Sequence, residues 1–196
     1  HALRQFGITA VNDFDPWSVY ESLDNLCRKG SLALRVIKGI PATYLDSAIN
    51  NGLKSGYGND WVKIGWLKLF ADGALGPQTA AMLTPYENSD SIGMLFLPKE
   101  DIIAIGEKAL PHGIAMAIHA IGDKAVRESL HALSHLDIGG LLHIPQLRSR
   151  IEHVQIFNHE DIHLFAKHDI LASMQPIHAI SDMEMAEIYW GMRCSN

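Results

Sequence analysis

One lysine and two histidines occur in this sequence at positions that suit a metal site, each late in a short segment predicted to be a strand. They are Lys68 in WLKLF, His119 in AMAIH and His153 in RIEH. Eleven histidines among 196 residues is a high count, and a neutral imidazole is the commonest metal ligand in proteins. Burial among apolar neighbours lowers the pKa of a lysine, and the neutral amine is the form that adds carbon dioxide to become an anionic, metal-bridging carbamate. These residue types therefore predict a metal site.

Each of these residues, taken alone, also has a structural explanation. A lysine on a strand can extend its amine to the strand end or pair with Asp72. A histidine late in a strand can be a core residue that is hydrogen-bonded to a backbone carbonyl. Arg150 and Glu152 share one face of a strand and can form an ion pair, whereas His153 points to the other face. The metal interpretation rests on the combination, because three such residues fall on three successive predicted strands.

Short apolar runs alternate along the chain with segments of helical period. We expect strands at 8–14, 32–37, 65–70, 114–119, 150–155 and 170–174. We expect helices at 16–29, 41–50, 99–112, 124–136 and 159–168. The predicted strands are apolar on both faces, which is typical of parallel strands covered by helices. Repeated strand-then-helix order predicts an α/β fold, either a barrel or a doubly wound sheet.

Chain length decides between the sizes of architecture. A full (β/α)₈ barrel takes roughly 250 residues, about 31 for each strand–helix unit. A chain of 196 residues therefore holds about six units. We expect one domain over residues 1–196, an incomplete parallel (β/α) TIM barrel with about strands 2–7 of eight. The sequence begins on His1 without a Met, which favours a central fragment of a longer protein, and the open barrel edges predict self-association.

Composition narrows the function classes. The formal net charge is −6 and no Lys/Arg cluster is present, which argues against a nucleic-acid partner. No apolar run is long enough to cross a membrane, so we expect no membrane partner. The two cysteines lie far apart in the sequence and indicate reduced thiols in a cytoplasmic protein. The remaining expectation is a small-molecule substrate.

Two further regions follow predicted strands and would share the catalytic mouth of a barrel. The stretch 72–98 is long and irregular, and loops of this length inside a compact domain are usually functional. We predict substrate contacts for Asp72 and Gly73, with turn formation as the alternative. Gln175 and His178 follow another strand and are predicted to bind substrate as well. His163 and His168, in and near the end of the predicted helix 159–168, are expected to be solvated.

Four motifs make the sequence recognisable. They are WLKLFADGALGPQTAAMLTPY (66–86), AIHAIGDKAV (117–126), RIEHVQ (150–155) and ASMQPIH (172–178). With them the chain resembles the amidohydrolase superfamily, in particular the metal-dependent hydrolases related to N-substituted formamide deformylase (amidohydrolase family 3 type). The resemblance implies a TIM barrel with Lys68 as the ligand on strand four, with or without carboxylation, His119 on strand five and His153 on strand six. It also implies one or two divalent ions, with zinc as the expected metal.

The same resemblance implies a function. It predicts hydrolysis of a non-peptide, amide-type carbon–nitrogen bond by a metal-activated water. In the family a His-x-His pair on strand one and an Asp after strand eight complete the site. The chain has no His-x-His, so we expect it to be inactive by itself. The alternative is a non-catalytic regulatory or binding protein on an amidohydrolase-like barrel; a sugar- or nucleotide-binding domain ranks last, because no Gly-rich phosphate loop follows a strand.

Overall fold

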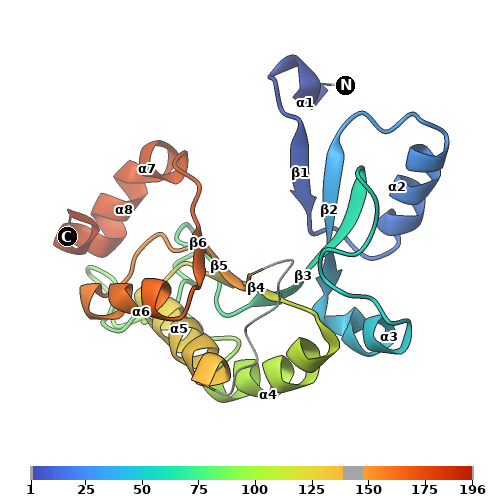
Figure 1. The fold of residues 1–196 in the computed structure, drawn as a ribbon. Coiled ribbons are helices and arrows are strands. Elements are labelled where there is room, and N and C mark those ends of the chain that lie inside the picture. Colours follow the sequence, from blue (N-terminus) through green and yellow to red (C-terminus); the bar gives the residue numbers. More distant parts are fainter. Residues whose placement is uncertain (1, 139–147, 196) are drawn as a thin grey trace.

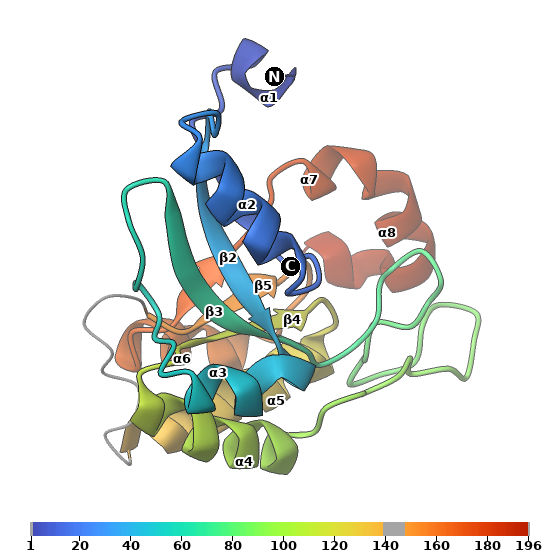
Figure 2. The ribbon, with the colours of Figure 1, turned by 90° about the vertical axis from the view of Figure 1, so that its right-hand side faces the viewer.

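A parallel sheet of six strands organises the chain. The computed structural model describes residues 2–138 and 148–195, and within them the strands follow one another in chain order, each parallel to its neighbour. The strands are β1 (Ala10–Asp13), β2 (Arg35–Pro41), β3 (Val62–Phe70), β4 (Met116–Ala120), β5 (Arg150–His153) and β6 (Leu171–Ser173). The sheet is curled into a half-barrel, as Figures 1 and 2 show. The predicted incomplete α/β barrel with six parallel strands is confirmed.

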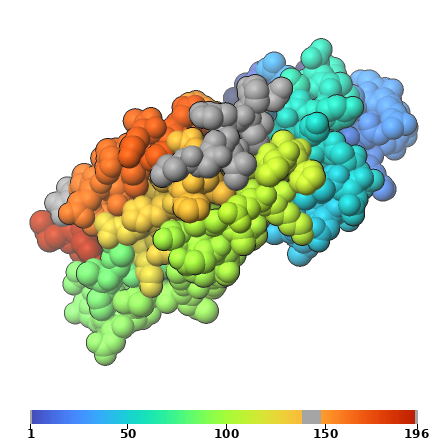
Figure 3. Space-filling view, turned by 60° about the horizontal axis from the view of Figure 1, so that its bottom comes forward, coloured from blue at the N-terminus to red at the C-terminus, as the bar shows by residue number. Residues whose placement is uncertain are grey.

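Helices cover the outer, convex side of this half-barrel. They are α2 (Val19–Arg28), α3 (Leu45–Asn50), α4 (Lys99–Ala109), α5 (Asp123–Ile138) and α6 (Ile162–Lys167). Figure 3 shows α4, α5 and α6 side by side on this face. Three further helices, which the sequence pattern did not predict, are α1 (Ala2–Gln5), α7 (His178–Ser181) and α8 (Met183–Trp190). In the described ranges 2–138 and 148–195, no helix has both the length and the apolar character of a membrane-spanning segment.

The apolar pattern of β4 explains why the sheet forms here. Met116, Ala117 and Ile118 are completely buried, and the core they belong to continues into α5 through Leu130 and Leu133. Because one face of the strand packs toward the helices and the other toward the inside of the barrel, both faces are apolar. Burial on both sides holds the strand in place, and near its carboxyl end it carries the candidate ligand His119.

Charged side chains lie among the aromatic rings of the concave face. Arg150 donates from Nε to Glu152 Oε1 at 2.6 Å, which confirms the predicted ion pair. The guanidinium of Arg150 lies 3.5 Å from the centroid of the Trp66 ring. Lys38, completely buried in β2, donates to Asp13 of β1 at 2.6 Å. A buried charge is tolerated only when it is paired in this way.

One expectation about the outer helices is wrong. His163 is exposed, as predicted, but His168 at the end of α6 is buried. Its Nδ1 lies 2.7 Å from Asp137 Oδ2 near the end of α5. The sequence pattern of α6 does not contain this contact, because it depends on how α6 packs against α5.

The turn after β4 depends on a glycine. A Cβ atom on Gly122 would lie 2.0 Å from the carbonyl oxygen of Ala81, which also accepts hydrogen bonds from the N–H groups of Lys124 and Ala125. We expect Gly122→Ala to lower the free energy of unfolding by about 1–3 kcal/mol, because the backbone at Ala81 must move. Urea denaturation measures this loss. Gly76→Ala is the control, since a Cβ there meets only Met185 Sδ at 3.5 Å; an equal loss in both variants would contradict the explanation.

The two outer strands, β1 and β6, each pair with one neighbour within the described residues. An unpaired strand edge is a template for pairing with a second molecule. We therefore expect the 196-residue chain to self-associate in a concentration-dependent way, measured by light scattering after size exclusion. Ala172→Lys, at an exposed position of β6, should reduce the association. A monomer at every concentration would refute this expectation.

Candidate metal centre

The fold brings Lys68, His119 and His153 to one edge of the sheet. Because all strands are parallel, their carboxyl ends meet there, and the three residues lie on the adjacent strands β3, β4 and β5. The ring centroids of His119 and His153 are 4.6 Å apart. Phe70 links the set, since its ring centroid lies 5.3 Å from that of His119 and 4.2 Å from the Nζ atom of Lys68. The arrangement agrees with the predicted set, and the role of its members as ligands stays a prediction.

The side chain of Lys68 is buried, and one hydrogen bond of its amine is found within the described residues. Its Nζ donates to the carbonyl oxygen of Leu69 at 3.2 Å and lies over the rings of Phe70 and Phe14. Burial lowers the pKa of this amine to about 8, while the Glu152 carboxylate opposes the shift. About a tenth of the amine is therefore neutral at pH 7, far more than for an ordinary lysine, and this is the form that carboxylation requires.

His119 has one ring nitrogen already engaged. Its Nε2–H donates to the carbonyl oxygen of Gly73 at 2.8 Å. Because a carbonyl oxygen accepts only, this hydrogen bond places the proton on Nε2 and leaves the lone pair on Nδ1. Burial lowers the pKa of His119 to about 4, so the ring is neutral at pH 7. A neutral imidazole whose other nitrogen donates to a carbonyl is the usual state of a metal-binding histidine.

His153 has the complementary arrangement. Its Nδ1 lies 2.7 Å from Gln175 Oε1, and Gln175 Nε2 donates to the carbonyl oxygen of Ser173 at 2.9 Å. The second bond fixes the orientation of the Gln175 amide, so its oxygen accepts the Nδ1 proton and the lone pair of His153 is on Nε2. Burial lowers the pKa of His153 as well. Gln175 thus positions His153, and its predicted contact with substrate stays a prediction.

Backbone strain turns His153 toward the mouth of the barrel. Regular alternation would send it to the face opposite Glu152. Instead β5 ends at His153, whose φ is 75°, and Val154 follows with a φ of 49°. Such left-handed conformations cost about 1–3 kcal/mol for residues other than glycine, and they concentrate at functional sites. The His153 ring contacts the rings of both His119 and His178 as a result.

Asp72 and Gly73 both lie next to the ring nitrogen Nε2 of His119. The side chain of Asp72 is fully buried and accepts N–H hydrogen bonds from Ala81, Ile121 and Gly122 at 2.8–3.0 Å. Its Oδ1 lies 3.6 Å from His119 Nε2. Burial raises the pKa of Asp72 to about 6, against the effect of the three hydrogen bonds. The predicted substrate contacts of both residues stay a prediction, while their visible contacts hold His119 in place.

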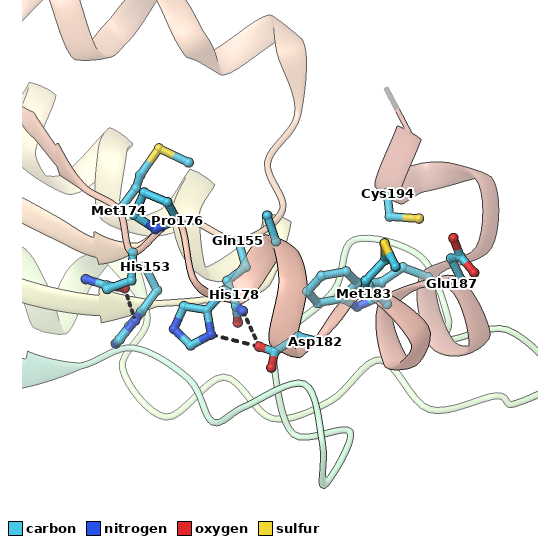
Figure 4. A pocket seen from close by; sticks show the side chains of 13 residues that line it. His153, Gln155, Met174, Pro176, His178, Asp182, Met183, Glu187 and Cys194 are labelled. Atoms are coloured by element: carbon cyan, nitrogen blue, oxygen red, sulfur yellow. Dashed lines mark hydrogen bonds and ion pairs between the residues drawn. The ribbon is translucent and has the colours of Figure 1, made fainter.

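His178 lies beside this group, in α7. Its ring centroid is 5.8 Å from that of His153, and its Nδ1 is 2.8 Å from Asp182 Oδ2 (Figure 4). A cavity of about 510 Å³ opens between these rings and α8. This volume is in the range of small-molecule sites. The predicted placement of His178 at the same mouth agrees with the structure.

The donor set suits a divalent ion in part. In the described part of the chain, no three side chains of the types His, Cys, Asp and Glu gather closely enough to hold a metal. The available donors are Nδ1 of His119, Nε2 of His153 and an oxygen of Lys68 after carboxylation. Two imidazoles and one anionic oxygen are ligands that Zn²⁺ accepts, and catalytic zinc sites commonly have three protein ligands. These three residues would therefore fit such an ion once Lys68 is carboxylated.

Comparison with known proteins places the chain in a family. The sequence pattern of the amidohydrolase family matches residues 1–191. The chain belongs to this family. It is similar to a solved structure named an uncharacterized metal-dependent hydrolase from Pyrococcus horikoshii OT3, with 30% identity, a TM-score of 0.84 and coverage of 98% of this chain and 38% of that one. A protein of the same description from Pyrococcus furiosus has 28% identity and a TM-score of 0.76 over 93% of this chain and 36% of that one.

A curated relative carries a different kind of name. The exoenzymes regulatory protein AepA of Pectobacterium carotovorum subsp. carotovorum is 30% identical over 172 residues, which are 85% of this chain and 36% of the relative. The amidohydrolase chain thus spans less than two fifths of the length of these three proteins.

The lowered pKa of Lys68 leads to a test by pH. Its pKa is about 8 in the folded chain and 10.5 as the ordinary value, so the unfolded chain binds more protons between these limits. The stabilisation is therefore present above pH 10.5 and is lost as the pH falls through 8. We expect the free energy of unfolding to rise over this interval by up to about 3 kcal/mol more in the wild type than in Lys68→Met.

Urea denaturation of metal-free protein in CO₂-free buffer measures this difference. Lys63→Met is the matched control, because Lys63 is exposed on the same strand and its replacement should leave the pH dependence intact. An unchanged pH dependence in Lys68→Met would show that the amine is not desolvated.

Proposed function

We propose that this chain is the ligand-bearing part of a metal-dependent hydrolase. Its substrate is a small molecule with an amide-type, non-peptide carbon–nitrogen bond. The ligands are Lys68, His119 and His153, with zinc as the metal, as one or two ions. The observation that carries the proposal is the pair of fixed imidazoles, each with one nitrogen bound to an oxygen acceptor and the other left for an ion.

Each residue has a separate task in this proposal. When bound, a divalent ion lowers the pKa of water to about 7 and polarises a carbonyl group. His119 and His153 supply neutral nitrogens, because burial disfavours their charged forms. Lys68 supplies an oxygen donor once its neutral amine has added carbon dioxide. Asp72 and Gly73 keep His119 in position, and Gln175 keeps His153 in position.

Hydrolysis is proposed for the longer protein. The similar hydrolases are more than twice as long as this chain, so it holds only part of what such a protein contains. We therefore propose that the 196-residue chain by itself is inactive.

Cys27 and Cys194 are free thiols, which supports a reducing compartment such as the cytoplasm.

The name of AepA supports a second candidate, a non-catalytic regulatory protein on the same fold. The two candidates differ in what they require of Lys68. A binding protein needs no ion at the mouth of the barrel. A hydrolase needs the ligands intact.

The test combines metal affinity with turnover. We expect His119→Ala and His153→Ala to weaken zinc binding strongly, and Gln175→Leu to weaken it by about 10–100-fold through loss of the positioning hydrogen bond. Competition with a chromophoric chelator measures the affinity. His163→Ala is the control, because this exposed histidine lies on α6 and binds only the carbonyl oxygen of Glu160 among the described residues.

A panel of simple amides then tests turnover by the full-length protein. Hydrolysis that disappears in Lys68→Ala supports the hydrolase. Incubation with ¹³C-bicarbonate tests carboxylation. A ¹³C NMR signal of a carbamate carbon that is present in the wild type and missing in this variant supports it. Equal zinc affinity of all variants, together with no turnover, would favour the regulatory candidate.

A further inference from the structure

The cavity beside His153 has a polar end and an apolar end. It is bounded by the segment that follows β6 and by α8, and His153 and Gln175 form part of its wall (Figure 4). A ligand in it would therefore lie directly beside one of the proposed metal ligands. No contact of the mechanism described above uses the rest of this space.

Three donors fix the polar end. The carboxylate of Asp182 receives hydrogen bonds from His178 Nδ1 and Gln155 Nε2, both at 2.8 Å on Oδ2, and from Ser181 Oγ at 2.8 Å on Oδ1. These contacts lower the pKa of Asp182, so the carboxylate is charged at neutral pH. His178 is thereby held by one nitrogen, and its other nitrogen, Nε2, lies on the side of the cavity toward His153.

The opposite end is apolar and carries no positive charge. Met183, Ala186 and Trp190 of α8 form its walls, and Glu187 lies beside Met183 (Figure 4). The lining includes the carboxylates of Asp182 and Glu187 but neither a lysine nor an arginine. Burial of a neutral hydrophobic group in such a space lowers the free energy of the complex. An anionic group would instead be repelled by the carboxylates.

We propose that this cavity binds the hydrophobic substituent of the amide substrate, and that His178 Nε2 makes a hydrogen bond to the amide group at the entrance. The carbonyl carbon is then held beside His153. The substrate class is an amide with a neutral, apolar substituent that carries no carboxylate on its far end. This inference rests on the proposed function, and it makes His178 a positioning residue for the bond that is cleaved.

Binding to the metal-free 196-residue chain tests the cavity without requiring turnover. The probes are acetamide, hexanamide and the monoamide of adipic acid, with dissociation constants from ¹H–¹⁵N NMR titration. We expect hexanamide to bind at least about tenfold more tightly than acetamide, because four more methylene groups leave water. The adipic monoamide should lose this advantage, since its carboxylate would enter the opposite end, where the Glu187 carboxylate lies beside Met183.

Two variants separate the ends of the cavity. Ala186→Phe fills the apolar end and should remove the advantage of hexanamide while leaving acetamide unchanged. The matched control is Glu184→Phe, which adds the same ring at an exposed position of the same helix, outside the cavity. His178→Phe keeps a ring of similar size without its nitrogens, and it should weaken acetamide and hexanamide by the same factor.

The outcomes distinguish this inference from the proposed function. Equal dissociation constants for acetamide and hexanamide, or an equal loss in Ala186→Phe and Glu184→Phe, would overturn the cavity assignment. Retained NMR dispersion shows that the variants are folded. Selective binding without turnover by the full-length protein would support the cavity and overturn the hydrolytic function, whereas turnover without chain-length selectivity would do the reverse.

Discussion

The carboxylate of Asp72 joins parts of the chain that are far apart in sequence. It lies just beyond β3 and accepts N–H groups from Ala81 in the following loop and from Ile121 and Gly122 beyond β4. A buried carboxylate without partners would be very costly, so three donors must stay in place as long as it is charged. The same loop supplies the Gly73 carbonyl that fixes the His119 ring. The geometry of the candidate centre thus depends on this one buried group.

Burial, more than any charge pair, sets the chemistry of the candidate ligands. It is the largest cause of the lowered pKa of Lys68, His119 and His153. Metal ligands must be deprotonated, and a desolvated site holds them in that state before any ion arrives. Desolvation of these groups is unfavourable, and apolar packing of the surrounding core offsets it, including that of β4, which is buried on both faces. A rigid barrel interior and a set of neutral donors therefore have one physical origin.

Local sequence patterns were sufficient to predict the strands and the edge of the sheet at which the candidate ligands lie. The apolar runs identified all six strands, and the position of Lys68, His119 and His153 near strand ends placed them at one edge. Patterns did not contain the partners that set the tautomers, since Gly73 and Gln175 reach the rings only through tertiary packing. The left-handed backbone at His153 was equally hidden, because nothing in its residue type requires it. The helix α8 was missed, because its contacts with the loop after β3 arise only through tertiary packing.

Contacts of α8 and the residues after it link the wall of the cavity to the loop that supports the candidate metal centre. Arg193, beyond α8, donates to the carbonyl oxygens of Thr84 and Pro85 in the loop that begins at Asp72. Trp190 of α8 packs in one buried cluster with Tyr86 of that loop and Ile121 after β4. A displacement of α8 would therefore strain the loop that carries Asp72 and Gly73. Because the wall of the cavity and the support of His119 are tied together, a ligand held by α8 has a defined position relative to the candidate ligands, which is the condition for orienting a bond for cleavage.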